Sequence, residues 1–284
     1  MERIIGGYTI IEVMIFLAIS SILFVSAVIA VGGQQAHTEF SASMRDIDSK
    51  MQDWINQVVT GLSGSTAQGG SSPGNYGCIL DSDNRPILVT ATTERGANPQ
   101  CIFIGKAIQV NTEPQYNNQL TVYPVLGRRT YLSGSEQLLV SSLAEANPAP
   151  AISDAADLTE TYFLQNGARI KSVTSGPGLG DSPASRMIGF FLSFNTESNT
   201  SRNGSESLNT KQFSLTSNQD PGSNPVKNCL KLITTGLSAC STPPVDLQNW
   251  RLCFESTRNS DTATLTVSST NGQGAAVKLE FAGC

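Results

Sequence analysis

Residues 1–35 read MERIIGGYTIIEVMIFLAISSILFVSAVIAVGGQQ, and this stretch decides the fold of the chain. No charged residue occurs between Val13 and Gln35, and most positions there are Ile, Val, Leu, Phe, Met or Ala. A continuous apolar helix of about 20 residues crosses a bilayer core of about 30 Å. The alternative is a buried core helix, but few soluble domains of this size could wrap one so uniformly apolar. We therefore predict one membrane-spanning helix near the N-terminus.

Three kinds of segment begin in this way. A secretory signal peptide is cleaved after its apolar stretch at small residues, and the nearest match here is the imperfect AVG at residues 30–32. A plain membrane anchor needs no cleavage motif. In the third kind the cut precedes the apolar stretch. The residues GGYT at 6–9, followed by Glu12, are typical of that third kind.

Residues 1–15, MERIIGGYTIIEVMI, resemble the leader and first helical turns of type IV prepilins and their pseudopilin relatives. The resemblance implies that a prepilin peptidase cuts after Gly7 and that the new first residue, Tyr8, is then N-methylated. It also implies that Glu12, the fifth residue after the cut, acts in assembly. Residues 1–7 are then the leader, and residues 8–33 form the transmembrane and filament-core helix.

The resemblance further implies where the protein acts and with what. Its expected partners are the prepilin peptidase and N-methyltransferase, other pilin subunits, an inner-membrane assembly platform and the lipid bilayer. The expected location is the bacterial cytoplasmic membrane, crossed once with the C-terminal domain outside the cytoplasm, and then a cell-surface or periplasmic filament. The leader carries Glu2 beside Arg3, and the apolar segment lacks the proline of many pilins. These two departures leave the pilin subclass open.

Glu12 also has a physical argument of its own. A carboxylate inside a bilayer-spanning helix costs about 2.5–3.5 kcal/mol or more, so it needs a partner or a task. Cleavage after Gly7 would create a positive amine on Tyr8, four residues before Glu12. In a filament, Glu12 of one subunit could neutralise that amine in the preceding subunit, which sets axial register more than it adds stability. Alternatively, Glu12 of the unassembled protein lies at the cytoplasmic headgroup edge and reaches water.

Residues 34–60 change from uniformly apolar to amphipathic. Their apolar side chains recur at steps of three and four residues, which predicts a helix with one apolar stripe. We expect this stripe to lie on a sheet of the same chain, as the resemblance implies. A coiled coil with another copy is the alternative. The stripe consists of Phe40, Met44, Ile47, Met51, Trp54 and Val58.

Six cysteines follow the apolar segment, at positions Cys78, Cys101, Cys229, Cys240, Cys253 and Cys284. No two of them form a Cys-x-x-Cys pair, and zinc sites need closely spaced Cys and His ligands. Disulfides in an oxidising compartment are the better interpretation. Six cysteines permit 15 pairings. Our hypothesis is Cys78–Cys101, Cys229–Cys240 and Cys253–Cys284, with the last pair tethering the C-terminal strand.

The rest of the chain is typical of short strands separated by turns. Only 14% of the residues are charged, well below the usual share of about 25%. A Gly/Ser-rich loop is expected over residues 61–77, followed by an extracytoplasmic β-rich domain over residues 78–284. Many of its segments alternate apolar and polar residues, as half-buried antiparallel strands do. The expected strands are 76–80, 86–91, 101–104, 107–110, 120–125, 187–194, 211–215, 227–233, 250–254, 262–267 and 276–281.

Short helices, one hairpin and two long loops are predicted between these strands. Short helices are expected over Glu136–Ala146 and Asp154–Gln165, and a tight hairpin at Gly105-Lys106. Long polar loops are expected over Ser172–Arg186 and Asn195–Asn209.

Nothing in the sequence favours catalysis, a cofactor or a metal. His37 is the sole histidine, and the GSSPG motif at residues 70–74 lacks the strand, helix and histidine base that a nucleophile elbow needs. The glycine-rich residues 176–180 lack the spacing of a phosphate-binding loop. The net charge of −5, with Arg128-Arg129 as the longest basic run, disfavours nucleic acid. We therefore expect a protein that assembles and is not an enzyme.

The sequence as a whole predicts an α+β protein, in which a long N-terminal helix packs on a mainly antiparallel, disulfide-bearing β-domain. The expected function is a structural subunit of a type IV pilus or a type II secretion-like filament. The size and irregularity of the β-domain suggest a minor subunit. Two alternatives stay open: a membrane-tethered binding or adhesive domain that never polymerises, and an anchored extracytoplasmic enzyme.

Overall fold

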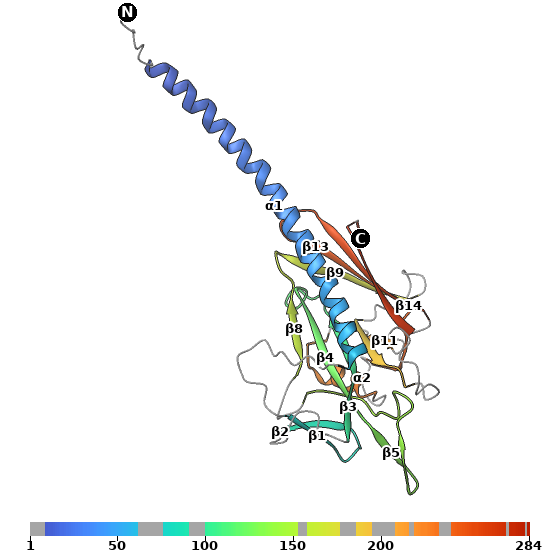
Figure 1. Cartoon of the computed structure of the whole chain (residues 1–284). Coiled ribbons are helices and arrows are strands. Elements are labelled where there is room, and N and C mark those ends of the chain that lie inside the picture. The colour runs from blue at the N-terminus through green and yellow to red at the C-terminus, as the bar shows by residue number, and fades with distance from the viewer. Residues whose placement is uncertain are drawn as a thin grey trace, which may run out of the picture.

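The computed structural model describes residues 9–61, 76–90, 100–152, 158–176, 186–194, 208–215, 219–232, 240–270, 273–281 and 283–284. Its first element is the 51-residue helix α1 (Ile10–Thr60), about 75 Å long at 1.5 Å per residue. Gly61 ends the helix in the left-handed conformation (φ 69°), which glycine adopts without strain. The N-terminal half of α1 projects from the protein, and its C-terminal half lies against the strands (Figure 1).

The remaining elements are one short helix and fifteen strands, so the described residues form an α+β protein with a mostly antiparallel sheet domain, as predicted. The short helix is α2 (Asn224–Leu230). The strands are β1 (Tyr76–Leu80), β2 (Pro86–Thr90), β3 (Cys101–Val110), β4 (Gln119–Arg128), β5 (Thr130–Ser133), β6 (Glu136–Leu139), β7 (Ala149–Pro150), β8 (Glu160–Phe163), β9 (Ala168–Ser175), β10 (Met187–Leu192), β11 (Leu208–Leu215), β12 (Cys240–Asp246), β13 (Asn249–Ser256), β14 (Thr262–Thr270) and β15 (Gln273–Glu280).

The main sheet runs β7-β4-β3-β10-β11-β15-β14-β13-β9, with β8 added beside β4 and β12 beside β11. One half of this sheet ends at β11 and the other half begins at β15. The two halves meet where Asn209 of β11 pairs with Gln273 of β15. The C-terminal half of α1 and residues from both halves of the sheet share one buried apolar cluster. The sheet is thus divided into two parts that the same helix contacts.

The predicted apolar stripe of α1 supplies a large part of that cluster. Each of its six side chains is at most 1% exposed: Phe40, Met44, Ile47, Met51, Trp54 and Val58. They share the cluster with Ile108 of β3, Ile188 of β10 and Trp250 of β13. The stripe is therefore buried within the chain itself.

Three sequence-based predictions in the β-domain are wrong, each for its own reason. Residues Glu136–Ala146 form strand β6 and a turn, since Gly134 in the left-handed conformation (φ 67°) closes a β5–β6 hairpin. Residues Asp154–Gln165 contain strand β8, which pairs with β4 from Gln119 to Val122. The segment 227–233 begins in helix α2, whose proline in the first turn favours a helix start.

The hairpin predicted at Gly105-Lys106 is also absent, because β3 runs unbroken through both residues. Gly105 is needed there for close packing: a Cβ atom at this position would lie 2.1 Å from the carbonyl oxygen of Phe190. The pairing of β3 with β4 shifts register between Phe103 and Gly105. The glycine therefore marks a close approach of two strands, which is one of the common reasons for a glycine inside a strand.

Three predicted loops are shorter than expected. Strand β1 begins at Tyr76, within the range 61–77, and residues 62–75 lie outside the described residues. Strand β9 includes Ser172–Ser175, and its pairing with β13 shifts register between Ile170 and Ser172. Strand β11 begins at Leu208, and residues 195–207 also lie outside the described residues.

Two of the predicted disulfides are confirmed. Cys78 is joined to Cys101, with Cα atoms 6.1 Å apart, and Cys253 to Cys284, with Cα atoms 5.7 Å apart. Cys229 is also disulfide-bonded. The side chain of Cys240 lies outside the described residues, so the Cys229–Cys240 pairing stays a prediction.

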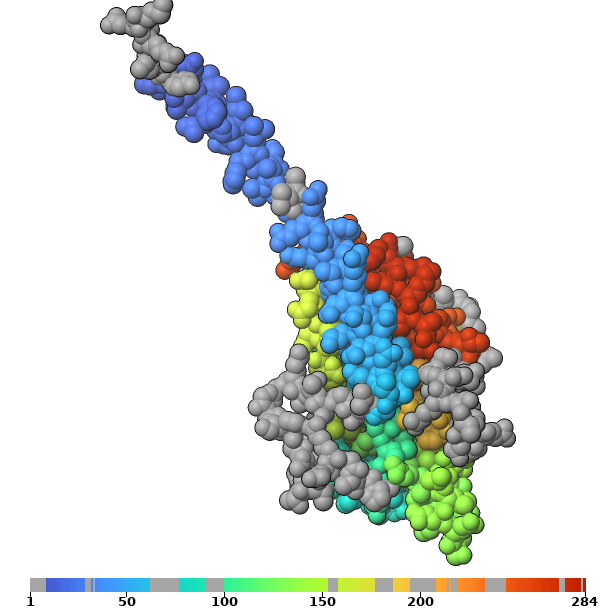
Figure 2. Space-filling model, in the orientation of Figure 1, coloured from blue at the N-terminus to red at the C-terminus, as the bar shows by residue number. Residues whose placement is uncertain are grey.

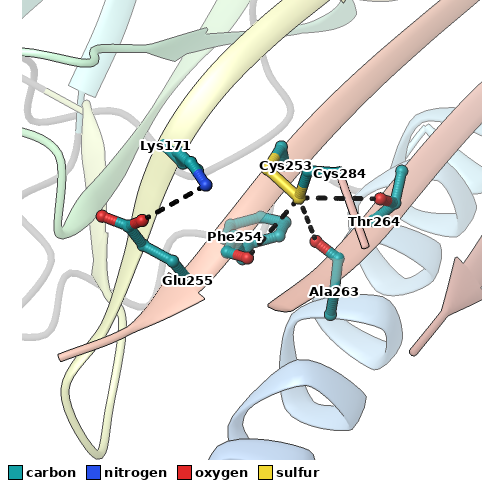
Figure 3. The surroundings of a disulfide bond; sticks show 7 residues. All are labelled: Lys171, Cys253, Phe254, Glu255, Ala263, Thr264 and Cys284. Carbon is teal, nitrogen blue, oxygen red and sulfur yellow. Dashed lines mark hydrogen bonds and ion pairs between the residues drawn. A yellow bond between two sulfur atoms is a disulfide. The ribbon is translucent and has the colours of Figure 1, made fainter. Parts of the chain in front are cut away.

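The Cys253–Cys284 bridge tethers the C-terminus to β13, as expected. Strand β14 lies between β13 and β15, so the C-terminal residues cross β14 to reach Cys253. The sulfur of Cys284 lies 3.8 Å from the carbonyl oxygen of Phe254, in β13, and 3.7 Å from that of Ala263, in β14 (Figure 3). The bridge therefore fastens the C-terminus across the sheet, where it restrains fraying.

Candidate assembly surface on helix α1

The N-terminal part of α1 exposes apolar side chains from Ile10 to Val28. The segment Ile10–Val28 has a mean hydropathy of 2.4, and none of it is buried in the protein. It spans about 28 Å, close to the thickness of a bilayer core of about 30 Å. Figure 2 shows it standing free of the domain. Thirteen large apolar side chains there are 46–83% exposed: Ile10, Ile11, Val13, Met14, Ile15, Phe16, Leu17, Ile19, Ile22, Leu23, Phe24, Val25 and Val28.

Two of the three serine hydroxyl groups within this segment are satisfied by the helix itself. Ser21 donates to the carbonyl oxygen of Leu17 at 2.7 Å, and Ser26 donates to that of Ile22 at 2.8 Å. Such bonds to the residue four positions earlier remove the need for water at these side chains. The segment is therefore suited to lipid, or to the apolar helices of other copies, in spite of its serines.

Glu12 is placed at the start of α1 by a reciprocal capping box with Thr9. The Glu12 carboxylate accepts from the backbone N–H and the hydroxyl of Thr9, both at 3.1 Å, and the Thr9 hydroxyl accepts from the Glu12 N–H at 3.3 Å. The box satisfies backbone donors that a helix start leaves open. Gly7 and Tyr8 lie outside the described residues.

Sequence reasoning missed this capping role, although its signal was present. Thr9-Ile10-Ile11-Glu12 matches the pattern of a Ser or Thr followed three positions later by Glu, just before an apolar run. The capping box places the first helical residue at Ile10, two residues after Tyr8.

A collar of polar contacts marks the level where α1 enters the domain. We define the collar as the α1 residues His37, Glu39 and Ser43 with the β8–β9 and β13–β14 turns that they contact. His37 Nδ1 lies 2.7 Å from Asp261 Oδ2, and Glu39 forms an ion pair with Arg258.

The β8–β9 turn closes the other side of the collar. Asn166 donates to the carbonyl oxygen of Glu39 at 3.1 Å, and Ser43 donates to that of Gln165, also at 3.1 Å. These contacts join residues more than 120 positions apart, so no local pattern in the sequence could have revealed them. They fix the level at which the exposed half of α1 begins.

Metal ligands and grooves are the next features of the described part of the domain. Within it, no group of three or more His, Cys, Asp or Glu side chains is placed to hold a metal ion. A groove between the end of α1 and the β14–β15 hairpin is lined in part by Ile55, Val59, Leu208 and Ser269, which are apolar or hydroxyl side chains. The GSSPG motif at residues 70–74 lies outside the described residues. The exposed half of α1 is therefore the feature that most needs a functional explanation.

Comparison of the chain with protein-family models, with curated proteins and with solved structures found no match.

Proposed function

We propose that this protein is a type IV pilin-like subunit, which is held in a membrane by the exposed half of α1 and assembles into a filament through the same surface. One observation carries the proposal: a single continuous helix buries an apolar stripe in its own domain over its C-terminal half, and is exposed, apolar and headed by a carboxylate over Ile10–Val28. Apolar burial is worth about 25 cal/mol per Å², so this surface calls for a bilayer or other copies of itself.

The position of Glu12 supports assembly over simple anchoring. A carboxylate near the end of a spanning segment adds cost to a plain anchor and does nothing for insertion. Both hydrogen bonds from Thr9 end on the Oε2 atom of Glu12, and a carboxylate has about four acceptor sites in total. The same side chain can therefore start its own helix and also accept a positive N-terminal amine from the preceding subunit.

The partners follow from this chemistry. Cleavage after Gly7 by a prepilin peptidase would supply the positive amine on Tyr8, and methylation of that amine would keep its charge. Head-to-tail packing of identical apolar helices builds an open helical filament, because the contact does not close on itself. The disulfides Cys78–Cys101 and Cys253–Cys284 suit an oxidising location outside the cytoplasm. An assembly platform in the inner membrane would be needed to move the subunits.

Replacing Gly7 tests the processing step. We expect Gly7→Val to leave the precursor inserted in the membrane but uncut, so that the leader stays on every copy. The measurement is the fraction of chains carrying residues 1–7, determined by mass spectrometry of the membrane fraction.

Gly32→Val is the matched control. Nothing lies within 4 Å of a Cβ atom at Gly32, so the change should be tolerated and processing should be normal. An ordinary secretory signal peptide, cut near residue 32, predicts the reverse: Gly7→Val processed normally and Gly32→Val blocked. That reverse result would contradict the proposed function.

A further inference from the structure

Lys106 is a buried cation at the contact between α1 and the sheet. Its side chain is 1% exposed, whereas lysine is almost never fully buried unless it is paired. The ammonium nitrogen donates to the amide oxygen of Gln57, from α1, and lies 3.8 Å from Glu160 Oε2, from β8. Three elements, α1, β3 and β8, therefore bring an amine, a carboxamide and a carboxylate together.

The burial of Lys106 makes its ammonium group easier to deprotonate than that of an exposed lysine. Burial lowers the pKa of Lys106 below its ordinary value, while the charges of Glu160 and Asp53 oppose that shift and the charge of Lys50 adds to it. A neutral lysine amine is a nucleophile, and desolvation is one established way to activate it.

The carboxamide of Gln57 is held in a fixed orientation. Its nitrogen donates to Asp53 Oδ2 at 2.8 Å, one helical turn earlier on α1, and its oxygen accepts from Lys106. The carbonyl carbon is bonded to that oxygen, so it is one covalent bond away from the atom that the amine contacts. Holding the reacting groups in contact removes much of the entropic barrier to a bimolecular reaction.

We propose that Lys106 and Gln57 form an intramolecular isopeptide bond. Glu160 accepts a proton from the ammonium group of Lys106, and the freed nitrogen lone pair attacks the Gln57 carbonyl carbon. The tetrahedral intermediate collapses as its C–N bond to the original amide nitrogen breaks. The departing nitrogen takes up the proton held by Glu160 and also the second proton given up by the attacking nitrogen, so it leaves as an ammonium ion and Glu160 returns to its carboxylate form. The products are one secondary amide between the two side chains and one ammonium ion, with no oxidant, metal or cofactor needed.

The cross-link would close a loop between residues 49 positions apart and would join α1 to β3 covalently. Force applied along α1 would then reach the sheet through a covalent bond as well as through packing. The inference depends on the three side chains only, so it stands or falls independently of whether the chain is cut after Gly7.

The test uses the full chain, purified from membranes in detergent, reduced, unfolded and digested with trypsin. We expect one branched peptide containing positions 57 and 106, lighter by one ammonia than the two separate peptides together, and no cleavage at Lys106. Glu160→Gln should reduce the cross-linked fraction from nearly complete to nearly none. Gln52→Ala is the matched control, because Gln52 makes the same kind of bond to Asp48 on the exposed face of α1 but contacts no lysine.

Separate peptides in the wild-type digest, with normal cleavage at Lys106, would overturn the proposal and leave a hydrogen-bonded buried lysine only. Conversion of Gln57 to Glu without a branched peptide would overturn it as well. A cross-link that persists in full in Glu160→Gln would remove the assigned role of Glu160. The wild-type digest alone decides whether the bond exists, so the result does not depend on whether any variant folds.

Discussion

Trp54→Ala is expected to lower the free energy of unfolding of the domain by about 3–5 kcal/mol, the usual cost of removing a fully buried tryptophan. Trp54 is 1% exposed in the cluster shared by α1 and the sheet. Its ring meets the edge of Tyr162, from β8, with ring centroids 6.0 Å apart and planes at 83°. The substitution removes this contact and leaves a cavity where the helix lies on the sheet.

The hydroxyl group of Tyr162 makes the loss larger than burial alone suggests. It donates to Asp46 on α1, and burial together with that bond raises the pKa of Tyr162, so the hydroxyl stays protonated as a donor. Without Trp54 the ring that carries this donor is no longer held in place. Chemical denaturation of the full chain in detergent measures the effect. Gln52→Ala, on the exposed face, should stay within about 0.5 kcal/mol of wild type. Equal stability of both variants would show that α1 is not part of the domain core.

Glu12→Val is expected to abolish incorporation into filaments while leaving membrane insertion unharmed or improved. Insertion gains because a costly carboxylate leaves the apolar segment. Assembly fails because the positive amine of the neighbouring subunit loses its partner, and an uncompensated buried charge is strongly destabilising. The measurement is the share of the variant in sheared filaments against its share in the membrane fraction.

Thr9→Val separates the two roles of Glu12. This change breaks the capping box, which costs about 1 kcal/mol, but keeps the carboxylate. If Glu12 acts between subunits, Thr9→Val still assembles. If Glu12 only caps its own helix, both variants lose assembly to the same degree, and the intersubunit role is excluded. Normal filament content of Glu12→Val would exclude any assembly role.

The sequence predicted the elements whose patterns are long or strongly periodic. The apolar run and the stripe from Phe40 to Val58 placed α1, and alternating residues placed β10, β13 and β14. The Cys78–Cys101 pair was predicted as a link between neighbouring strands, and the Cys253–Cys284 pair as a tether for a C-terminus that would otherwise fray. The local sequence pattern predicted an element correctly wherever the local preference and the tertiary contacts favoured the same structure.

The failures at β8, at Lys106 and at the collar share a cause, which is the dominance of distant contacts. Strand β8 was expected to be helical, but pairing with β4 decides its state. Lys106 was interpreted as a turn residue, although it is buried beneath α1 against Gln57, 49 positions earlier. The collar joins His37 to Asp261 across 224 positions. The capping box of Glu12 is the exception, because its signal was local and was overlooked.

The most direct test of the central claim is the mass of the N-terminal peptide of the wild-type protein recovered from membranes. The account predicts a mature chain that begins with N-methylated Tyr8 and retains the whole apolar segment Ile10–Val28. A mature chain that begins near Gly33 would contradict it, because the exposed half of α1 would then be a discarded secretion signal and could not assemble anything.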